Sequence, residues 1–275
     1  WSIQSEYHKY VNYEKNTFIA YGGRGTSMGL KTDERIVNFI KRKIKNCKSI
    51  VAVLGIEMLV EGGGYDLDTN EENYRVEEKY GFSPEDMLST SFFNAKVEKF
   101  YRFYKKEILG MQLHSTPAYE GLEKLQQQGK LSAVICQNFH GIPKTVHLDK
   151  VIDLNGNIYI NQCPHCDKGF DIEYIINSKG IPQCDRCKMA IRPGIRLIGE
   201  RVDAELMTQA AVACDKADVL LILGKNMYHD KLEYSVAPEH EQLKVLFSKN
   251  EFERNSKVDF IIRDDISEFL PLIIN

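Results

Sequence analysis

The chain has 275 residues, which is enough for a sizeable hydrophobic core and for one large domain with an inserted module or two. Its composition, 43% hydrophobic and 27% charged with a net charge of −3, is ordinary for a globular protein and gives no general argument for binding nucleic acid or a membrane surface. No apolar run approaches the roughly 18 residues of a transmembrane helix, and no signal-peptide pattern opens the chain, so we expect a cytoplasmic protein. Because the first residue is Trp1 and not Met, we also expect a trimmed or processed N-terminus.

Residues 1–32 are predicted to form an N-terminal extension rich in aromatic and polar residues. Its glycine-rich stretch 22–27 is interpreted as a plain loop, with phosphate binding as the alternative, because a phosphate loop needs a strand before it and a helix after it. The next segment, 33–46, places its isoleucines and Phe39 near one face at helical spacing, and this pattern predicts an amphipathic helix.

A short run rich in β-branched residues at 49–54 predicts a buried parallel strand that ends at Gly55. A strand that enters a glycine loop is where an α/β sheet builds its nucleotide site, and the loop here spans 55–66. The loop is not a G-x-G-x-x-G sequence, because Glu57 stands where close approach to a pyrophosphate favours glycine. A carboxylate beside phosphates is repulsive unless it points away or meets a cation. The loop alone is therefore weak support for a dinucleotide site.

The segment 68–116 is predicted to be mainly helical, with Ser83 as a helix N-cap and Pro84 at the first helical position. An aromatic stripe from Phe93 to Ile108 repeats at helical spacing. We interpret it as core packing, with a ligand-binding box as the alternative. Another helix is expected at 117–128.

Polar residues follow the next two predicted strands. The buried strand 131–136 runs into Gln137, Asn138 and His140, and a short strand at 150–154 ends at Asn155. Polar side chains at the carboxyl ends of parallel strands lie where such sheets bind ligands.

Two C-x-x-C pairs separated by 17 residues give the strongest signal in the sequence. The four cysteines are Cys163, Cys166, Cys184 and Cys187. Zn²⁺ prefers four soft ligands at tetrahedral corners, and two such turns close its coordination shell, so we predict a zinc ribbon with a structural role. The alternative is two disulfides or four free thiols. The other three cysteines, Cys47, Cys136 and Cys214, are interpreted as buried free thiols.

The C-terminal part repeats the order of strand, glycine turn and helix. It is expected to contain a helix at 202–216, strands at 218–223, 243–247 and 258–262, and a closing helix at 265–270. This repetition predicts an α/β fold with a doubly wound, Rossmann-like parallel sheet. We expect the sheet domain at 33–67, 117–157 and 193–275, a helical insertion at 68–116 and the zinc-ribbon module at 158–192.

A parallel sheet with a four-cysteine ribbon inserted after its middle strands resembles the sirtuin family. Gln137-Asn138 is similar to the family's Gln-Asn-x-Asp motif, and 191–200 resembles the segment that ends in Phe-Gly-Glu. Stretch 220–227 resembles the strand that ends in Gly-Thr-Ser-Leu, and 246–250 the later strand that ends in Ile-Asn. The resemblance covers residues 36–275. Gly64-Tyr65-Asp66 is similar to the class M sirtuins, which lack the usual catalytic histidine and are regarded as protein ADP-ribosyltransferases.

The chain departs from the family pattern at several site positions. Gly55-Ile56-Glu57 replaces Gly-Ala-Gly, His140 replaces the Asp of Gln-Asn-x-Asp, Asn155 replaces the catalytic His, and Lys225-Asn226 replaces Thr-Ser. The resemblance implies a site for NAD or ADP-ribose at Gly55, Ile56, Glu57, Gly64, Asp66, Gln137, Asn138, Gly224, Lys225, Asn226 and Asn250. It implies catalytic roles for Asn138, Asn155 and His140.

The replacement of the catalytic histidine by Asn155 affects which of the family's reactions we expect. In family deacylation, that histidine accepts a proton from a ribose hydroxyl, and Asn155 cannot. General-base assistance contributes about 10²–10⁴-fold, so we expect deacylation to be inefficient. Cleavage of the NAD⁺ glycosidic bond needs mainly positioning and charge stabilisation, so transfer of ADP-ribose depends less on the missing histidine than deacylation does. His140 or His147 standing in as a base is one alternative, and plain loop or surface histidines the other.

Three functions are open on the sequence. The first is an NAD-dependent ADP-ribosyltransferase or weak deacylase acting on a protein, and the second is a degenerate sirtuin that binds a nucleotide without turnover as a regulatory or interaction protein. The third, an unrelated zinc-ribbon adaptor, gains little support because the charges of the ribbon are mixed. The resemblance implies a protein or peptide partner in the cleft between the two domains, with stretch 195–200 lining the groove and pairing with an extended peptide. No nucleic-acid or membrane partner is expected.

Overall fold

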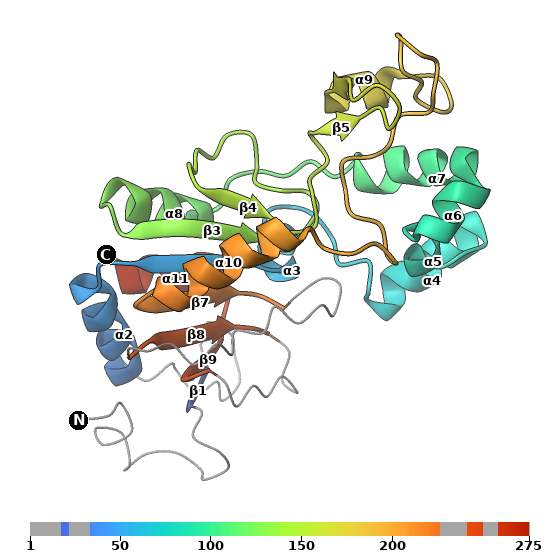
Figure 1. The fold of residues 1–275 in the computed structure, drawn as a ribbon. Coiled ribbons are helices and arrows are strands. Elements are labelled where there is room, and N and C mark those ends of the chain that lie inside the picture. The colour runs from blue at the N-terminus through green and yellow to red at the C-terminus, as the bar shows by residue number, and fades with distance from the viewer. Residues whose placement is uncertain (1–17, 22–33, 226–240, 250–257, 275) are drawn as a thin grey trace.

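The computed structural model describes residues 18–21, 34–225, 241–249 and 258–274 (Figure 1). The glycine-rich stretch 22–27 lies outside these residues. The main sheet comprises β1 Phe18–Tyr21, β2 Ile50–Leu54, β3 Leu131–Cys136, β4 Val151–Asp153, β7 Val219–Leu223, β8 Leu243–Phe247 and β9 Phe260–Arg263. Across the described ranges, no helix is both long and apolar enough to cross a membrane.

The strands pair in the order β1-β9-β8-β7-β2-β3-β4, and every pairing is parallel. From β2 the chain continues outward to β3 and β4, returns to β7 on the other side of β2, and continues outward to β8 and β9. The doubly wound prediction is therefore confirmed. The direction of winding reverses between β2 and β7, and ligands of open α/β sheets bind outside the carboxyl ends of the strands at such a switch point.

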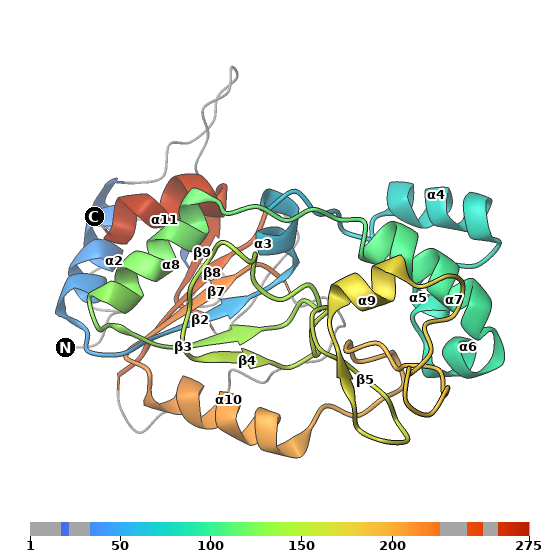
Figure 2. The same cartoon turned by 90° about the horizontal axis from the view of Figure 1, so that it is seen from above.

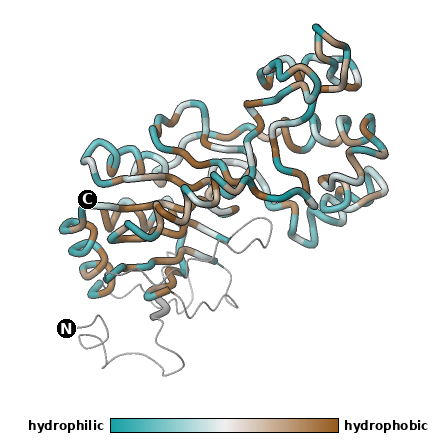
Figure 3. Tube along the Cα trace, in the orientation of Figure 1, coloured by the Kyte–Doolittle hydropathy of each residue, from teal (hydrophilic) through white to brown (hydrophobic). Residues whose placement is uncertain are grey.

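Helices cover both faces of the sheet. They are α2 Glu34–Asn46, α8 Pro117–Gln127 and α11 Ile266–Ile274 on one face and α10 Ala204–Lys216 on the other (Figure 2). Successive side chains of β2 alternate between the two cores, with Ala52 packed toward α2, α8 and α11, and Val51 and Val53 toward α10. The central strands are buried on both faces, which explains their continuous apolar runs (Figure 3).

A smaller domain lies beyond the carboxyl edge of the sheet, joined to it by α3 Ile56–Glu61 and by the loops that follow the strands (Figure 1). It contains α4 Asn70–Tyr80, α5 Pro84–Met87, α6 Thr90–Ala95, α7 Val97–Phe103, the π-helical turn η1 Tyr104–Ile108, the hairpin β5 Asn161–Gln162 and β6 Gly169–Phe170, and α9 Ile172–Asn177. Ser83 accepts a hydrogen bond from the Asp86 backbone N–H, so the predicted helix cap is confirmed.

The helical insertion and the zinc-ribbon module share one hydrophobic core. Phe100, Tyr101 and Tyr104 of the aromatic stripe pack in the same cluster as Cys163 and Cys184. The stripe is therefore core packing, as its helical spacing predicts. Tyr101 donates a hydrogen bond from its hydroxyl to the carbonyl of Ile191, and the Lys105 ammonium donates to the Ser178 carbonyl at 2.7 Å. These contacts tie the helices to the cysteine-bearing loops.

Two elements differ from the sequence expectation. α11 runs to Ile274, past the predicted end at 270, and includes Pro271. Its apolar residues Phe269, Leu270 and Ile273 are buried against the sheet, and this burial outweighs the hydrogen bond that proline removes. β1 lies within the stretch treated as an extension and adds a parallel strand beside β9.

Candidate functional site

The loops after β2 and β7 meet at the switch point of the sheet. The Gly55 N–H donates to the Leu223 carbonyl at 2.9 Å, and the Ile56 N–H donates to the Lys225 carbonyl at 2.9 Å. A Cβ on Gly55 would lie 2.3 Å from the Lys225 carbonyl oxygen, so only glycine allows the two chains to approach this closely. In a phosphate-binding loop, backbone N–H groups at this place point toward the ligand. Here the N–H groups of Gly55 and Ile56 donate to carbonyls of the chain itself.

The Glu57 carboxylate enters the same junction from the first turn of α3. Its Oε2 accepts the backbone N–H of Lys225 at 2.6 Å. Gly224 has a φ of +104°, and a Cβ there would lie 2.3 Å from this oxygen, so both the backbone conformation and the carboxylate require glycine. Burial raises the pKa of Glu57 to about 7, against the opposing effect of the hydrogen bond from Lys225.

The side chain of Lys225 pairs with Asp66. Its ammonium lies 2.9 Å from Asp66 Oδ2, and the Asp66 side chain is 13% exposed. Burial alone would lower the pKa of Lys225, but the hydrogen bond and charge of Asp66 raise it. Gly64 packs against Leu59 in the turn that leads to Asp66, where a Cβ would lie 2.8 Å from Leu59 Cγ.

A second group of predicted residues follows β3. The Gln137 N–H donates to the Leu54 carbonyl at 3.0 Å, which places this group beside the β2 loop. Asn138 has no exposed surface, and neither its amide oxygen nor its amide nitrogen has a hydrogen-bond partner among the described residues. A buried amide without partners is costly and rare in proteins. Asn138 therefore has one acceptor and two donors that no described residue uses.

His140 points toward the small domain. It is fully buried, its ring lies tilted against Phe139 with 4.8 Å between the ring centroids, and its Nε2 is 3.0 Å from the Ile108 carbonyl in η1. Burial lowers the pKa of His140 to about 4, so the ring is neutral near pH 7. His147 is exposed, and its backbone is held by Glu123. These surroundings favour a structural histidine at 140 and a surface histidine at 147.

The side chain of Asn155, which the sequence resemblance aligns with the catalytic histidine, has hydrogen-bond partners on two sides. Its side-chain N–H donates to the Gln137 carbonyl, and its Oδ1 accepts from Arg196 Nε at 2.9 Å. Arg196 in turn donates to the Glu200 carbonyl at 2.9 Å. Sequence reasoning did not single out Arg196, because its contact with Asn155 joins residues 41 positions apart. The guanidinium brings a fixed positive charge next to the site.

The segment 195–200 already pairs with the chain itself. The Ile198 N–H donates to the Leu88 carbonyl and its carbonyl accepts from the Thr90 N–H, both at 2.9 Å. The Leu197 N–H donates to Glu200 Oε2 at 2.8 Å. These donors and acceptors are therefore already used by hydrogen bonds within the chain.

A buried carboxylate anchors the loop that carries Asp66. Glu107 of η1 accepts hydrogen bonds from the Tyr65 hydroxyl at 3.2 Å, from Arg75 at 2.9 Å and from Lys79 and Tyr80 at 2.6 Å. Sequence reasoning missed this cluster. A carboxylate within an otherwise buried aromatic stripe was the available signal, because a buried charge must find partners.

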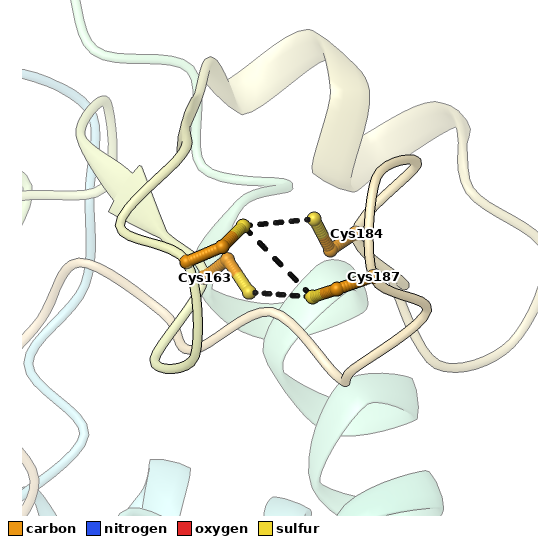
Figure 4. Close-up of side chains that lie close together, drawn as sticks. Cys163, Cys184 and Cys187 are labelled. Atoms are coloured by element: carbon orange, nitrogen blue, oxygen red, sulfur yellow. Dashed lines mark hydrogen bonds between the residues drawn. The ribbon is translucent and has the colours of Figure 1, made fainter.

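The four cysteines of the ribbon converge as predicted (Figure 4). Their Sγ atoms all lie within 4.8 Å of one another, with 3.4 Å between Cys163 and Cys187 and 3.6 Å between Cys166 and Cys184. A tetrahedral zinc ion with bonds of about 2.3 Å separates its sulfurs by about 3.8 Å, so the spacing fits. None of the four is in a disulfide. Four thiolates leave no open position on the metal, so this zinc has a structural role.

Two predicted nucleotide-binding residues, Asn226 and Asn250, lie outside the described residues. The others form two neighbouring groups, one around Glu57 and Lys225 and one around Asn138 and Asn155.

Comparisons with known proteins agree on one family. Residues 72–229 match the model of the Sir2 family. The chain is 30% identical over 243 residues to an NAD-dependent protein deacetylase of Clostridium perfringens, covering 87% of this chain and 98% of that protein. It is 29% identical to the corresponding deacetylase of Clostridium acetobutylicum over 86% of this chain and 98% of that protein.

Solved structures share the fold. Sir2Tm bound to a propionylated peptide superposes with a TM-score of 0.72 at 24% identity, covering 86% of this chain and 95% of that one. A Sir2 homologue in complex with NAD superposes with a TM-score of 0.73 at 20% identity, covering 92% of this chain and 94% of that one.

Proposed function

The chain belongs to the Sir2 family, and on this premise we propose that it binds NAD⁺ or ADP-ribose at the carboxyl edge of its sheet and transfers ADP-ribose to a protein, with deacylation as a weaker activity. NAD⁺ would supply the ADP-ribose, with nicotinamide as the leaving group. The protein or peptide acceptor would bind between the sheet domain and the small domain.

The observation that carries this proposal is the buried amide of Asn138. Both of its polar atoms lack a partner among the described residues, and it follows β3 next to the switch point. An amide with one acceptor and two donors complements the carboxamide of nicotinamide. At this end of the site the residues fit the nucleotide.

Asn155 explains why transfer is favoured over deacylation. Its side chain can hydrogen-bond a ribose hydroxyl through its second amide N–H but cannot take the proton. Arg196, which is bonded to Asn155 Oδ1, would further disfavour positive charge on a base at this place. Glycosidic cleavage depends mainly on positioning, which Asn138 and Asn155 can provide without proton transfer.

A second function, binding without turnover, is favoured by one specific observation. The Glu57 carboxylate occupies the backbone donor at Lys225, so the residues at the diphosphate end do not fit an anion as they stand. A regulatory protein that binds a nucleotide weakly or selectively would tolerate this contact better than an efficient enzyme.

Calorimetric titration with NAD⁺, combined with an assay for released nicotinamide, tests both functions. Asn138→Ala should weaken binding at least tenfold and leave the melting temperature unchanged or higher, because it removes an unsatisfied buried amide. Asn177→Ala, on the exposed end of α9, is the matched control and should change neither. Binding without nicotinamide release would support the second function, and equal binding by wild type and Asn138→Ala would refute the assigned site.

A further inference from the structure

The diphosphate end of the proposed site is closed by contacts within the chain. The Lys225 N–H is bonded to Glu57, the Ile56 N–H to the Lys225 carbonyl, and the Gly55 N–H to the Leu223 carbonyl. A phosphate oxygen that used the Lys225 donor would have to replace the Glu57 carboxylate, which already holds that donor at 2.6 Å.

The charges at this end also oppose a diphosphate. Glu57 and Asp66 are two carboxyl groups, and Lys225 is the cation between them, paired with Asp66 at 2.9 Å. Asp68 lies on the same loop and acts on Lys225, and His114 packs against Gly63 at the other end of α3. With Glu57 ionised, an incoming diphosphate meets a negative charge at the position of its backbone donor.

We propose that Glu57 is a specificity-determining residue of this site: a nucleotide that carries a diphosphate binds only with a proton on the Glu57 carboxyl group, whereas a nucleoside without phosphate binds independently of that proton. This inference rests on the proposed function, because it assumes that the nucleotide lies at the switch point. Glu57 takes this proton from solvent when the diphosphate binds and returns it to solvent when the ligand dissociates.

The geometry supports a group that changes charge near neutral pH. Glu57 is held in the junction by the 2.6 Å hydrogen bond from the Lys225 N–H, with Gly224 directly beside its Oε2, and its burial raises its pKa to about 7. If binding requires the protonated form, affinity should fall about tenfold between pH 6 and pH 8.

The test uses ADP-ribose as the diphosphate probe and adenosine as the probe without phosphate. Each is titrated by calorimetry into the zinc-loaded full chain at pH 6 and pH 8, in two buffers of different ionisation enthalpy to count protons. Wild type should bind ADP-ribose about tenfold more tightly at pH 6 and take up close to one proton at pH 8, with adenosine unaffected. Glu57→Gln should bind ADP-ribose equally at both pH values. Glu78→Gln, exposed on α4, should behave as wild type.

The outcomes separate this inference from the function on which it rests. Binding of ADP-ribose by wild type with equal affinity at both pH values and without proton uptake would overturn the role of Glu57 and leave the proposed function standing. A pH dependence retained in Glu57→Gln would assign it to another group and would overturn the inference as well. No binding of either probe by any variant with normal zinc content would overturn both.

Discussion

Glu107 is a buried carboxylate with several hydrogen-bond donors around it, and its replacement gives a quantitative prediction. The side chain is 5% exposed and accepts hydrogen bonds from Tyr65, Arg75, Lys79 and Tyr80. Burial alone would raise the pKa of Glu107, but these donors hold it at about 2, below its ordinary value of 4.5. Glu107→Gln keeps the shape of the side chain and removes the charge.

The magnitude follows from linkage between protonation and folding. A pKa depressed from 4.5 to about 2 corresponds to roughly 3 kcal/mol of stability at pH 7. Because the folded pKa is the lower one, this contribution is fully present above pH 4.5 and is lost as the pH falls toward 2. At pH 3.5 about 2 kcal/mol should remain.

Urea unfolding of wild type and Glu107→Gln at pH 7 and at pH 3.5 measures this difference. Effects of acid on the cysteine cluster are common to both proteins and cancel in the comparison. Glu173→Gln is the matched control, since its ion pair with Lys144 is exposed to solvent and such pairs contribute little to stability. The reasoning is refuted if Glu107→Gln costs no more than the control, or if its cost is the same at both pH values.

Three further predictions concern the metal and the site. Removal of zinc, by chelation or by Cys184→Ser, should unfold the small domain, because Cys184 lies in the core of that domain. Metal analysis and near-UV circular dichroism measure the effect. A chelated protein with an unchanged spectrum would contradict this prediction. Asn155→His should raise the rate of deacylation of an acetylated peptide by at most about 10²–10⁴-fold, because it restores a general base. Adding Arg196→Val should raise the rate further, because it removes the cation next to that base. If neither change raises the rate, the Glu57 end of the site also prevents productive binding. Gly224→Ala should lower the melting temperature more than Gly81→Ala does. Both glycines have a positive φ, but only a Cβ at position 224 would contact a neighbour, Glu57. Equal decreases in melting temperature would show that this contact does not destabilise the variant.

Much of the scaffold follows from local sequence signals. The strands 50–54, 131–136 and 219–223 are short apolar runs that end where glycine or polar residues begin, and burial on both faces of a parallel sheet requires that pattern. The two C-x-x-C turns predict the cysteine cluster because a metal site built from tight turns is encoded within a few residues.

The site is harder to predict because its contacts join distant parts of the chain. The sequence shows a carboxylate at Glu57, but it does not show that its hydrogen-bond partner is the backbone N–H of Lys225, 168 positions away. Periodicity cannot supply this contact, since it depends on which strands become neighbours and on how closely Gly55 and Gly224 let them approach. The same holds for Arg196, whose hydrogen bond to Asn155 joins residues 41 positions apart.

One measurement tests the central claim most directly: calorimetric titration of the zinc-loaded chain with NAD⁺ at pH 6, followed by quantification of nicotinamide in the same sample in the presence of an acceptor protein extract. The account predicts saturable binding at one site per chain, a loss of at least tenfold in affinity for Asn138→Ala, and release of nicotinamide. Absence of binding by a folded, zinc-loaded protein would contradict it.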